Sequence, residues 1–314
     1  MDITKFVLDC EARGLDDHTI QTYKGCVIDF LNYYSDPLTV GLDELRRYLK
    51  GLRSRELSGS TLKGYFAALS TYYEYLIFEK LIAYNPILPF RKRYLARIRP
   101  CLGGENTRQL ISIDEMRLLI QAAITPLDLV ILLLLAKTGI RRGELLALKI
   151  GDISLKHGII RIPAKAKRSQ RSAFIDEELH AALEKYISWR SHYTRSSRLL
   201  INMNGNKIQR DYPNKLIASL AEPLNLHIPR GALCDKLTPH CFRHWFTTWL
   251  YRAGMDKEFI KWLRGDSMSV ESWEIYNQID LEDVRQAYLW CIPSLLSFDM
   301  KLANFTKSSL KDAI

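Results

Sequence analysis

The feature that most constrains the fold is the apolar run Leu127–Ala136. A helix that is apolar on every side has to be covered by protein on every side. The run is far shorter than the roughly 20 residues that a bilayer requires, and Asp128 lies within it. We therefore expect a buried helix over 127–137 at the centre of a globular domain, interrupted by Thr138-Gly139.

The region before this helix predicts a separate domain. A chain of 314 residues is long enough for two domains. Within 1–90, four amphipathic segments are separated by helix-start and turn signals, which are Asp16-Asp17, Asp36-Pro37, Ser58-Gly59-Ser60 and Asn85-Pro86. We predict a compact helical domain over 1–90.

A basic segment follows this helical domain. Pro100 and Gly103-Gly104 interrupt residues 91–110, which indicates a linker. Its cations are either a solvated run or contacts to phosphate, and we predict the second. These cations are Arg91, Lys92, Arg93, Arg97 and Arg99.

The second domain is expected over 111–290 and combines helices with a little β-structure. Short β-strands are predicted at 150–154 and 159–162, and the segment SAFID returns after the basic tip AKAKRSQR. Helices are predicted at 177–191, 211–222, 239–252 and 256–263. The predicted fold class is therefore mainly α with a small β-sheet.

Charge and cysteine spacing limit the partners. The 45 Lys and Arg residues exceed the 35 acidic residues, giving a net charge of +10, which favours a polyanionic partner such as nucleic acid. The six cysteines form no CxxC pair, so neither a zinc site nor a disulfide framework is expected. The N-terminus lacks a basic segment followed by an apolar one, and we expect a cytoplasmic protein with reduced thiols.

The fourth predicted helix is rich in tyrosine, which allows two interpretations. We favour core packing; the alternative is a face against DNA, with Lys24 and Lys63 on phosphates. The tyrosines are Tyr65, Tyr72, Tyr73 and Tyr75.

Four separate pieces of the second domain carry chemistry. Arg141 follows the Thr138-Gly139 turn at a helix start, where an anion can bind. Lys165 lies at the end of GIIRIPAK, and His240 and Arg243 are three residues apart on one helix face. Tyr276 lies in SWEIYNQID. Each piece alone also has an ordinary structural explanation.

Taken together, the pieces resemble the tyrosine recombinase, or phage integrase, family. TGIRRGEL fits the family box T-G-[LMI]-R-x-x-E-L, and HCFRHWFTTWL fits H-x-[LF]-R-H-x-[FA]-[AT]-[TS]. LRGDSMSVESWEIY is similar to the L-G-H…Y region, and GIIRIPAK to the strand that holds the family's lysine. The resemblance covers about 111–290, and the helical first domain fits the family's core-binding domain.

The resemblance implies cleavage and rejoining of double-stranded DNA through a 3′-phosphotyrosyl intermediate. Tyr276 would be the nucleophile, and Arg141 and Arg243 would clamp the phosphate. Lys165 would be the general acid, and His240 would assist proton transfer or bind the phosphate. No metal, ATP or other cofactor is implied, and a tetramer on DNA is expected.

Two departures from the family pattern leave alternatives open. Asp266 stands where the family has a hydrogen-bond donor, and an ionised aspartate only accepts. We expect it to orient a donor such as Arg264 or Arg243, to be protonated, or to turn away. Lys167 is a rival of Lys165, and the hairpin tip predicts DNA contacts at Lys167, Arg168 and Arg171. The L-R-G-D sequence resembles archaeal members of the family.

The sequence also leaves two alternative functions open and predicts one feature of assembly. The alternatives to a recombinase are a catalytically inactive DNA-binding relative and an enzyme like type IB topoisomerases. The tail 291–314 is expected to be exchanged between protomers, with packing on its own domain as the alternative.

Overall fold

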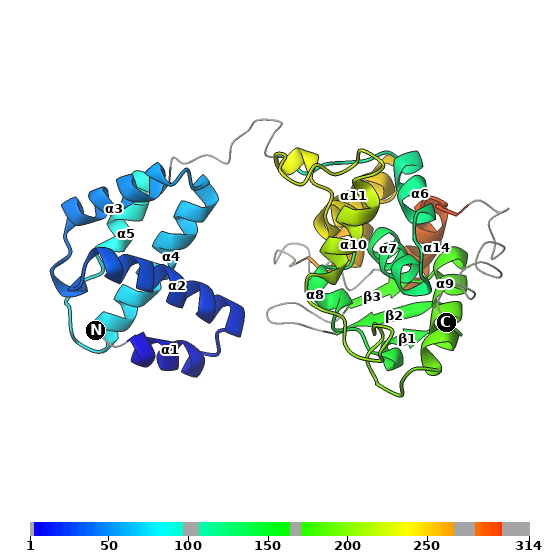
Figure 1. Ribbon diagram of the computed structural model, residues 1–314, viewed down its shortest axis with the longest axis horizontal. Helices are drawn as coiled ribbons and strands as arrows, with labels where there is room; N and C mark the ends of the chain where they lie inside the picture. The colour runs from blue at the N-terminus through cyan, green and yellow to red at the C-terminus, as the bar shows by residue number, and fades with distance from the viewer. Residues whose placement is uncertain (1–2, 97–106, 164–170, 267–279, 297–314) are drawn as a thin grey trace. The chain divides into compact units, whose positions relative to one another are not determined.

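The computed structural model describes residues 3–96, 107–163, 171–266 and 280–296. The chain forms two compact units, Met1–Leu102 and Gly103–Ile314 (Figure 1). Each unit has its own apolar core, so each is described by itself.

The first unit is helical throughout its described part. Side chains at helix starts satisfy the free backbone N–H groups of the first turn: Asp16 accepts from the Thr19 N–H at 3.1 Å, and Ser58 accepts from the Thr61 N–H at 3.2 Å. The elements are α1 (Ile3–Ala12), α2 (Asp17–Tyr33), η1 (Pro37–Thr39), α3 (Leu42–Ser54), α4 (Gly59–Phe78), α5 (Ile87–Phe90) and η2, a π-helical turn (Arg91–Leu95).

The tyrosines of α4 belong mainly to the core. Tyr72, Tyr73 and Tyr75 are buried, and the Tyr73 hydroxyl donates to the Pro37 carbonyl at 2.8 Å. The burial of these three side chains agrees with the interpretation that they pack in the core. Tyr65 is half-buried.

The helical unit extends further than the sequence suggested. Residues 91–96 were expected in a linker, but Arg91–Leu95 continues the chain of α5 as a helical turn, and Leu95 is buried in the same core as Phe90. Of the basic residues there, Arg91 is half-buried while Lys92 and Arg93 are exposed. Arg97 and Arg99 lie outside the described residues.

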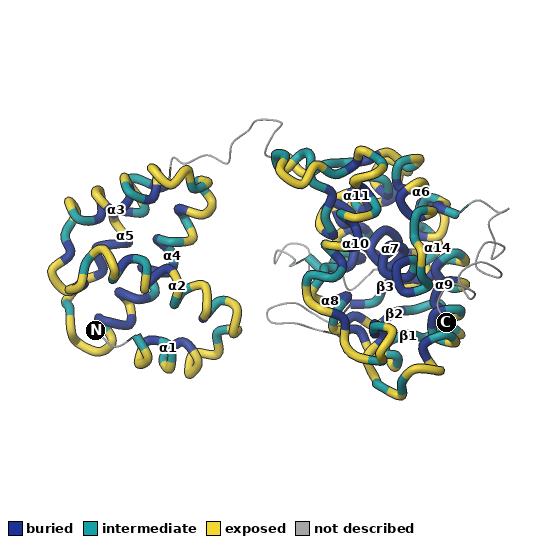
Figure 2. Tube along the Cα trace, in the orientation of Figure 1, coloured by how far each residue is buried: buried dark blue, intermediate teal, exposed yellow. Residues whose placement is uncertain are grey.

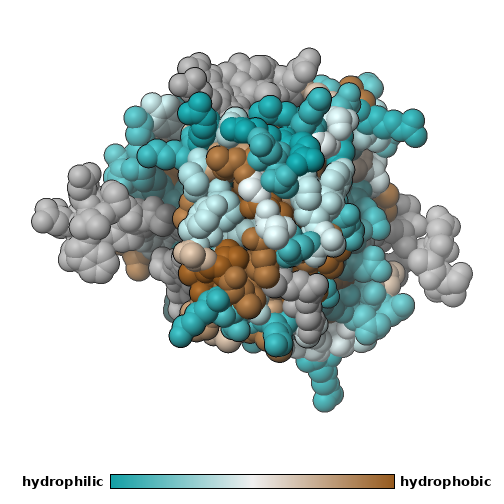
Figure 3. Space-filling model, turned by 90° about the vertical axis from the view of Figure 1, so that its left-hand side faces the viewer, coloured by the Kyte–Doolittle hydropathy of each residue, from teal (hydrophilic) through white to brown (hydrophobic). Residues whose placement is uncertain are grey.

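The surface of the first unit includes exposed apolar side chains. Figure 3 shows an apolar group amid mostly hydrophilic side chains on the side of the molecule that carries this unit. Exposed apolar side chains of the unit include Phe78, at 76%, and Leu81, at 48%. Lys24 and Lys63, the candidate phosphate contacts, are both half-buried.

The second unit surrounds the predicted apolar helix with other helices and a small sheet. Figure 2 shows α7 as buried along most of its length, and it packs against α9 and α11. Its helices are α6 (Ile113–Gln121), α7 (Pro126–Thr138), α8 (Arg142–Leu145), α9 (Glu177–Ser191), α10 (Tyr212–Ala221), α11 (Pro239–Arg252), α12 (Lys257–Arg264) and α14 (Leu281–Cys291), with 3-10 turns η4 (Ile150–Asp152) and η5 (Leu233–Asp235).

The sheet is antiparallel in the order β1-β2-β3, formed by β1 (Ile153–Ser154), β2 (Ile159–Ile162) and β3 (Arg171–Phe174). Ile160 pairs with Ile153 on one side and Ala173 on the other. The strand expected at 150–154 is shorter than predicted, because the Asp152 carboxylate accepts from the Lys149 N–H at 2.8 Å and closes a 3-10 turn.

Helix α7 begins and ends where local chemistry predicts. Thr125 caps its first turn, and the buried Asp128 accepts a hydrogen bond from the Tyr212 hydroxyl at 2.9 Å. Gly139 ends the helix in the left-handed region, with φ +56°. A Cβ there would lie 2.5 Å from the Phe246 ring, so glycine is required on two grounds. The predicted buried helix is confirmed.

A buried ion cluster joins the end of α7 to the segment after α14. Lys137 is 0% exposed, and its Nζ lies 2.6 Å from Asp176, 2.5 Å from Glu178 and 2.7 Å from the Pro293 carbonyl. Glu178 also accepts from the Leu295 N–H at 2.9 Å. Residues 293–296 are thereby held on their own unit; 297–314 lie outside the described residues.

No helix in the described part of the chain is both long and apolar enough to cross a membrane. The five cysteines that fall within this part are free thiols.

Candidate active site

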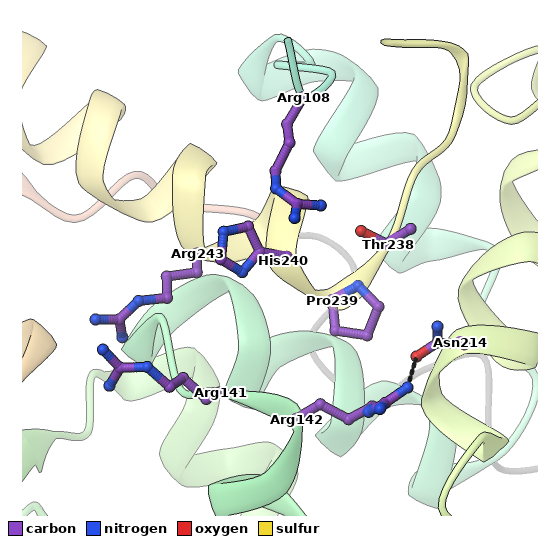
Figure 4. A pocket seen from close by; sticks show the side chains of 8 residues that line it. All are labelled: Arg108, Arg141, Arg142, Asn214, Thr238, Pro239, His240 and Arg243. Atoms are coloured by element: carbon purple, nitrogen blue, oxygen red, sulfur yellow. Dashed lines mark hydrogen bonds between the residues drawn. The ribbon is translucent and has the colours of Figure 1, made fainter. Parts of the chain in front are cut away.

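One cleft in the second unit collects cationic side chains from segments far apart in the sequence. It has a volume of about 330 Å³ (Figure 4). The lining residues are Arg108, Arg141, Arg142, Asn214, Thr238, Pro239, His240 and Arg243. Such a concentration of guanidinium groups suits an anion.

Arg141 stands at the start of α8, immediately after the turn at Gly139. Its Nη2 donates to Asp266 at 2.9 Å, and its Nη1 donates to Glu144 and to the Arg264 carbonyl, both at 3.2 Å. The side chain remains 24% exposed. The guanidinium is therefore oriented by three acceptors yet accessible from the cleft.

Arg243 lies on α11, and only 3% of its side chain is exposed. Its Nη1 donates to the Gly139 carbonyl at 2.8 Å, and its Nη2 donates to the Arg264 carbonyl at 2.8 Å and to Asp266 at 2.9 Å. Burial and the neighbouring Arg141 lower the pKa of Arg243.

The two guanidinium groups meet at a single oxygen. Arg141 directly precedes α8 and Arg243 lies on α11, yet both donate to Oδ1 of Asp266 at 2.9 Å. We call these two residues the arginine clamp. Figure 4 shows their guanidinium groups side by side at one edge of the cleft.

His240 lies at the start of α11, in the wall of the same cleft. Figure 4 shows Arg108 reaching toward it from the segment before α6. Burial, followed by Arg108 and Arg243, lowers the pKa of His240 below its ordinary value. This shift favours the neutral imidazole, the form that can accept a proton.

A buried ion pair supports the clamp from within. Glu144 contacts Arg141 on one side and Arg171 on the other, with 2.8 Å to Arg171 Nη2. Burial raises the pKa of Glu144, but the positive charge of Arg171 and the Arg141 N–H outweigh it, so the net shift is downward. The carboxylate stays ionised between the two arginines.

Arg171 does not lie where the sequence analysis placed it. We expected it on the exposed hairpin tip as a DNA contact, but it begins β3 and is 6% exposed. It is buried because it pairs with Glu144 and donates to the Leu263 carbonyl. It stabilises the site from inside the unit.

The comparisons with known proteins agree with this geometry. Residues 108–282 match the model of the phage integrase family, and residues 3–82 match the phage integrase N-terminal SAM-like domain. The chain belongs to the phage integrase family.

Relatives and solved structures extend over nearly the whole chain. The tyrosine recombinase XerC of Myxococcus xanthus is 25% identical over 88% of this chain and 92% of its own length. The tyrosine recombinase XerA of Saccharolobus solfataricus is 25% identical over 90% and 89%. The crystal structure of a lambda integrase (75-356) dimer bound to a COC' core site covers 89% of this chain and 97% of its own, with 16% identity and a TM-score of 0.68. The fold is therefore that of the family.

Several residues of the integrase cleft carry no signal in the sequence. Arg108 was hidden in a segment interpreted as linker, and Arg142 is the second arginine of TGIRRGEL. Arg142 donates to Asn214 at 3.1 Å, and nothing near Asn214 marks it as a site residue. A basic residue just before the capped start of α6 is the one available hint for Arg108.

Some of the predicted site residues lie outside the described part of the chain, namely Lys165, Lys167, Arg168 and Tyr276. Asp266 is described, and it contacts three arginines, since Oδ2 lies 2.9 Å from Arg264 Nε. Tyr288 is buried, and its hydroxyl donates to the Lys137 carbonyl at 2.8 Å. Burial raises the pKa of Tyr288, so it is unsuited to act as a nucleophile.

Proposed function

We propose that this protein is a site-specific DNA recombinase that cuts and rejoins DNA strands through a 3′-phosphotyrosyl bond. The observation that carries the proposal is the arginine clamp beside His240, in a cleft open to a substrate. Guanidinium groups fit the non-bridging oxygens of a phosphate and stabilise the charge added in the transition state.

The covalent step needs a nucleophile that attacks the phosphorus and a proton donor for the leaving oxygen on the opposite side. Tyr276 attacks, the P–O5′ bond breaks, and the P–O bond to tyrosine forms as the phenol proton passes to His240 or to water. The departing 5′-oxygen takes a proton from Lys165, with Lys167 as the alternative. His240 either assists proton transfer or hydrogen-bonds the phosphate. Because the ester stores the energy of the broken bond, rejoining reverses the step without ATP.

DNA contacts away from the cleft are also proposed. Lys92 and Arg93 are exposed on the first unit, and Arg91, Lys24 and Lys63 are half-buried there. Long cationic side chains of this kind reach phosphates while their stems stay packed. Arg97, Arg99, Lys167 and Arg168 complete the proposed set.

We further propose a tetramer on DNA, since exchange between two duplexes requires four strand cuts. Of the predicted tail 291–314, residues 291–296 pack on their own unit, so the proposed exchange concerns 297–314. We also propose a cytoplasmic location, which the free cysteines of the described residues support. The L-R-G-D sequence leads us to propose a relation to archaeal members of the family.

The test is covalent trapping. The protein is mixed with supercoiled plasmid carrying the DNA that flanks its own gene, and denaturant then traps any protein–DNA adduct. An adduct is expected with the native chain and with Tyr251→Phe, an exposed tyrosine used as control, but not with Tyr276→Phe. Mapping the adduct gives the target site.

Other outcomes select the alternatives. DNA that shifts in a gel without any adduct indicates an inactive DNA-binding relative. Relaxation of plasmid without sequence preference indicates topoisomerase-like activity. An adduct that survives Tyr276→Phe assigns the nucleophile to another tyrosine.

A further inference from the structure

We propose that Asp266 is a positioning residue, the permanent counter-ion that holds the arginine clamp together. The inference rests on the proposed function and names a role within that same site.

The first argument is geometry. The two carboxylate oxygens of Asp266 have different partners, because Oδ1 accepts from both Arg141 and Arg243 at 2.9 Å, whereas Oδ2 lies 2.9 Å from Arg264 Nε. The Arg264 carbonyl accepts from the same two clamp residues, at 3.2 and 2.8 Å. The segment 264–266 thus contacts both guanidinium groups through two acceptors.

The second argument is that the clamp needs a negative charge. Two guanidinium groups that share one acceptor repel each other, and this repulsion is stronger where water is excluded. Arg243 is 3% exposed, so water screens it poorly. Unpaired buried charges are strongly destabilising. The Asp266 carboxylate offsets the repulsion at the point where it is largest.

The third argument is that Asp266 is itself fixed. Gly265 ends α12 with φ +58°, and a Cβ there would lie 2.3 Å from Arg171 Cδ. The chain therefore turns against the buried Arg171–Glu144 pair before presenting Asp266. Because this turn is closely packed, we expect the Asp266 carboxylate to keep its position whether or not DNA is bound.

The fourth argument is a charge count. Six ionised groups form one contact network, and its four guanidinium groups and two carboxylates leave two positive charges. The network consists of Arg141, Arg171, Arg243, Arg264, Glu144 and Asp266. A phosphodiester carries one negative charge and its five-coordinate transition state carries two. Arg108 and Arg142 add further positive charge along the cleft. With both carboxylates in place the site therefore stays positive and still attracts the negative charge added in the transition state.

The test separates binding from cleavage. In Asp266→Asn the charge is lost and an N–H donor is gained at similar size. On duplex DNA carrying the mapped site, the single-turnover cleavage rate should fall about 10-fold or more, while affinity, followed by fluorescence anisotropy, should stay equal or become tighter. Asp266→Glu, which restores the charge, should recover part of the rate.

A second substrate separates a counter-ion from a proton donor. When sulfur replaces the bridging 5′-oxygen, the leaving group no longer needs an acid, so loss of a donor is rescued. The Asp266→Asn defect should persist on this substrate. The control Asp114→Asn removes an exposed carboxylate that pairs with Arg117 at 2.7 Å, and it should behave as the native protein.

Three results would overturn the inference. These are native cleavage by Asp266→Asn, rescue of its defect by the sulfur substrate, or loss of DNA affinity together with thermal stability, which indicates a role in folding alone. Failure of the proposed function would look different, because the native chain would then form no adduct at Tyr276 in the same assay.

Discussion

Two places in the second unit hold buried cations with carboxylates, and they differ in what remains accessible. At Lys137 the ammonium contacts two carboxylates and a carbonyl and is 0% exposed. At the clamp, Arg243 is nearly as buried, but Arg141 is 24% exposed and both line an open cleft. The first arrangement is closed and serves stability; the second leaves charge available to a ligand.

The largest effect should come from the clamp. Arg243→Gln removes a guanidinium that contacts the reacting phosphate in the proposed mechanism, so the single-turnover rate of adduct formation should fall by about 100-fold or more. Lys261→Gln, which removes an exposed lysine of the same unit, is the control. A rate within a few-fold of native would remove the clamp from the chemistry.

The Lys137 cluster should respond in the opposite way. Lys137→Met leaves the half-buried Asp176 and Glu178 without their cation, which should cost about 3–5 kcal/mol of unfolding free energy. Urea unfolding measures the loss, and the cleavage rate per folded molecule should stay near native. If Lys137→Met is fully folded but cannot cleave DNA, the Lys137 cluster does not serve stability alone and the contrast with the arginine clamp is wrong.

Gly139 lies between the Lys137 cluster and the arginine clamp. Its replacement should therefore lower both the free energy of unfolding and the cleavage rate, each by less than the two variants above. Gly139→Ala forces alanine into the left-handed region and against Phe246, at about 1–3 kcal/mol. The cleavage rate should also fall, because the Gly139 carbonyl holds Arg243. Thermal melting and adduct formation are measured together. Gly254→Ala also has a positive φ, but with open space at its Cβ, and is the matched control.

The smallest effect concerns the titration of His240. Arg108→Gln removes a positive neighbour, protonation of the imidazole becomes easier, and the pKa should rise toward 6.5. A proton NMR titration of the histidines measures it, with His240→Gln to assign the signal. An unchanged or lower pKa would show that Arg108 does not act on His240.

The parts predicted from sequence are those with a local cause. Helix α7 follows from a run that is apolar on all sides, and Arg141 and Arg243 follow from spacing within two boxes. The sequence left three options for Asp266, because its environment depends on α8 and α11. Arg171 was misplaced because it ends a basic run, whereas Glu144, from the preceding α8, and the Gly265 turn decide its burial.

The clamp also has a consequence for a chain that is still being made. Its contacts join residues 139–144, 243 and 264–266, so no shorter N-terminal fragment holds both guanidinium groups on their shared acceptor. A nascent or partly folded molecule therefore lacks an assembled phosphate site. In the proposed mechanism, strand-cutting capacity therefore arises only after the second unit has folded.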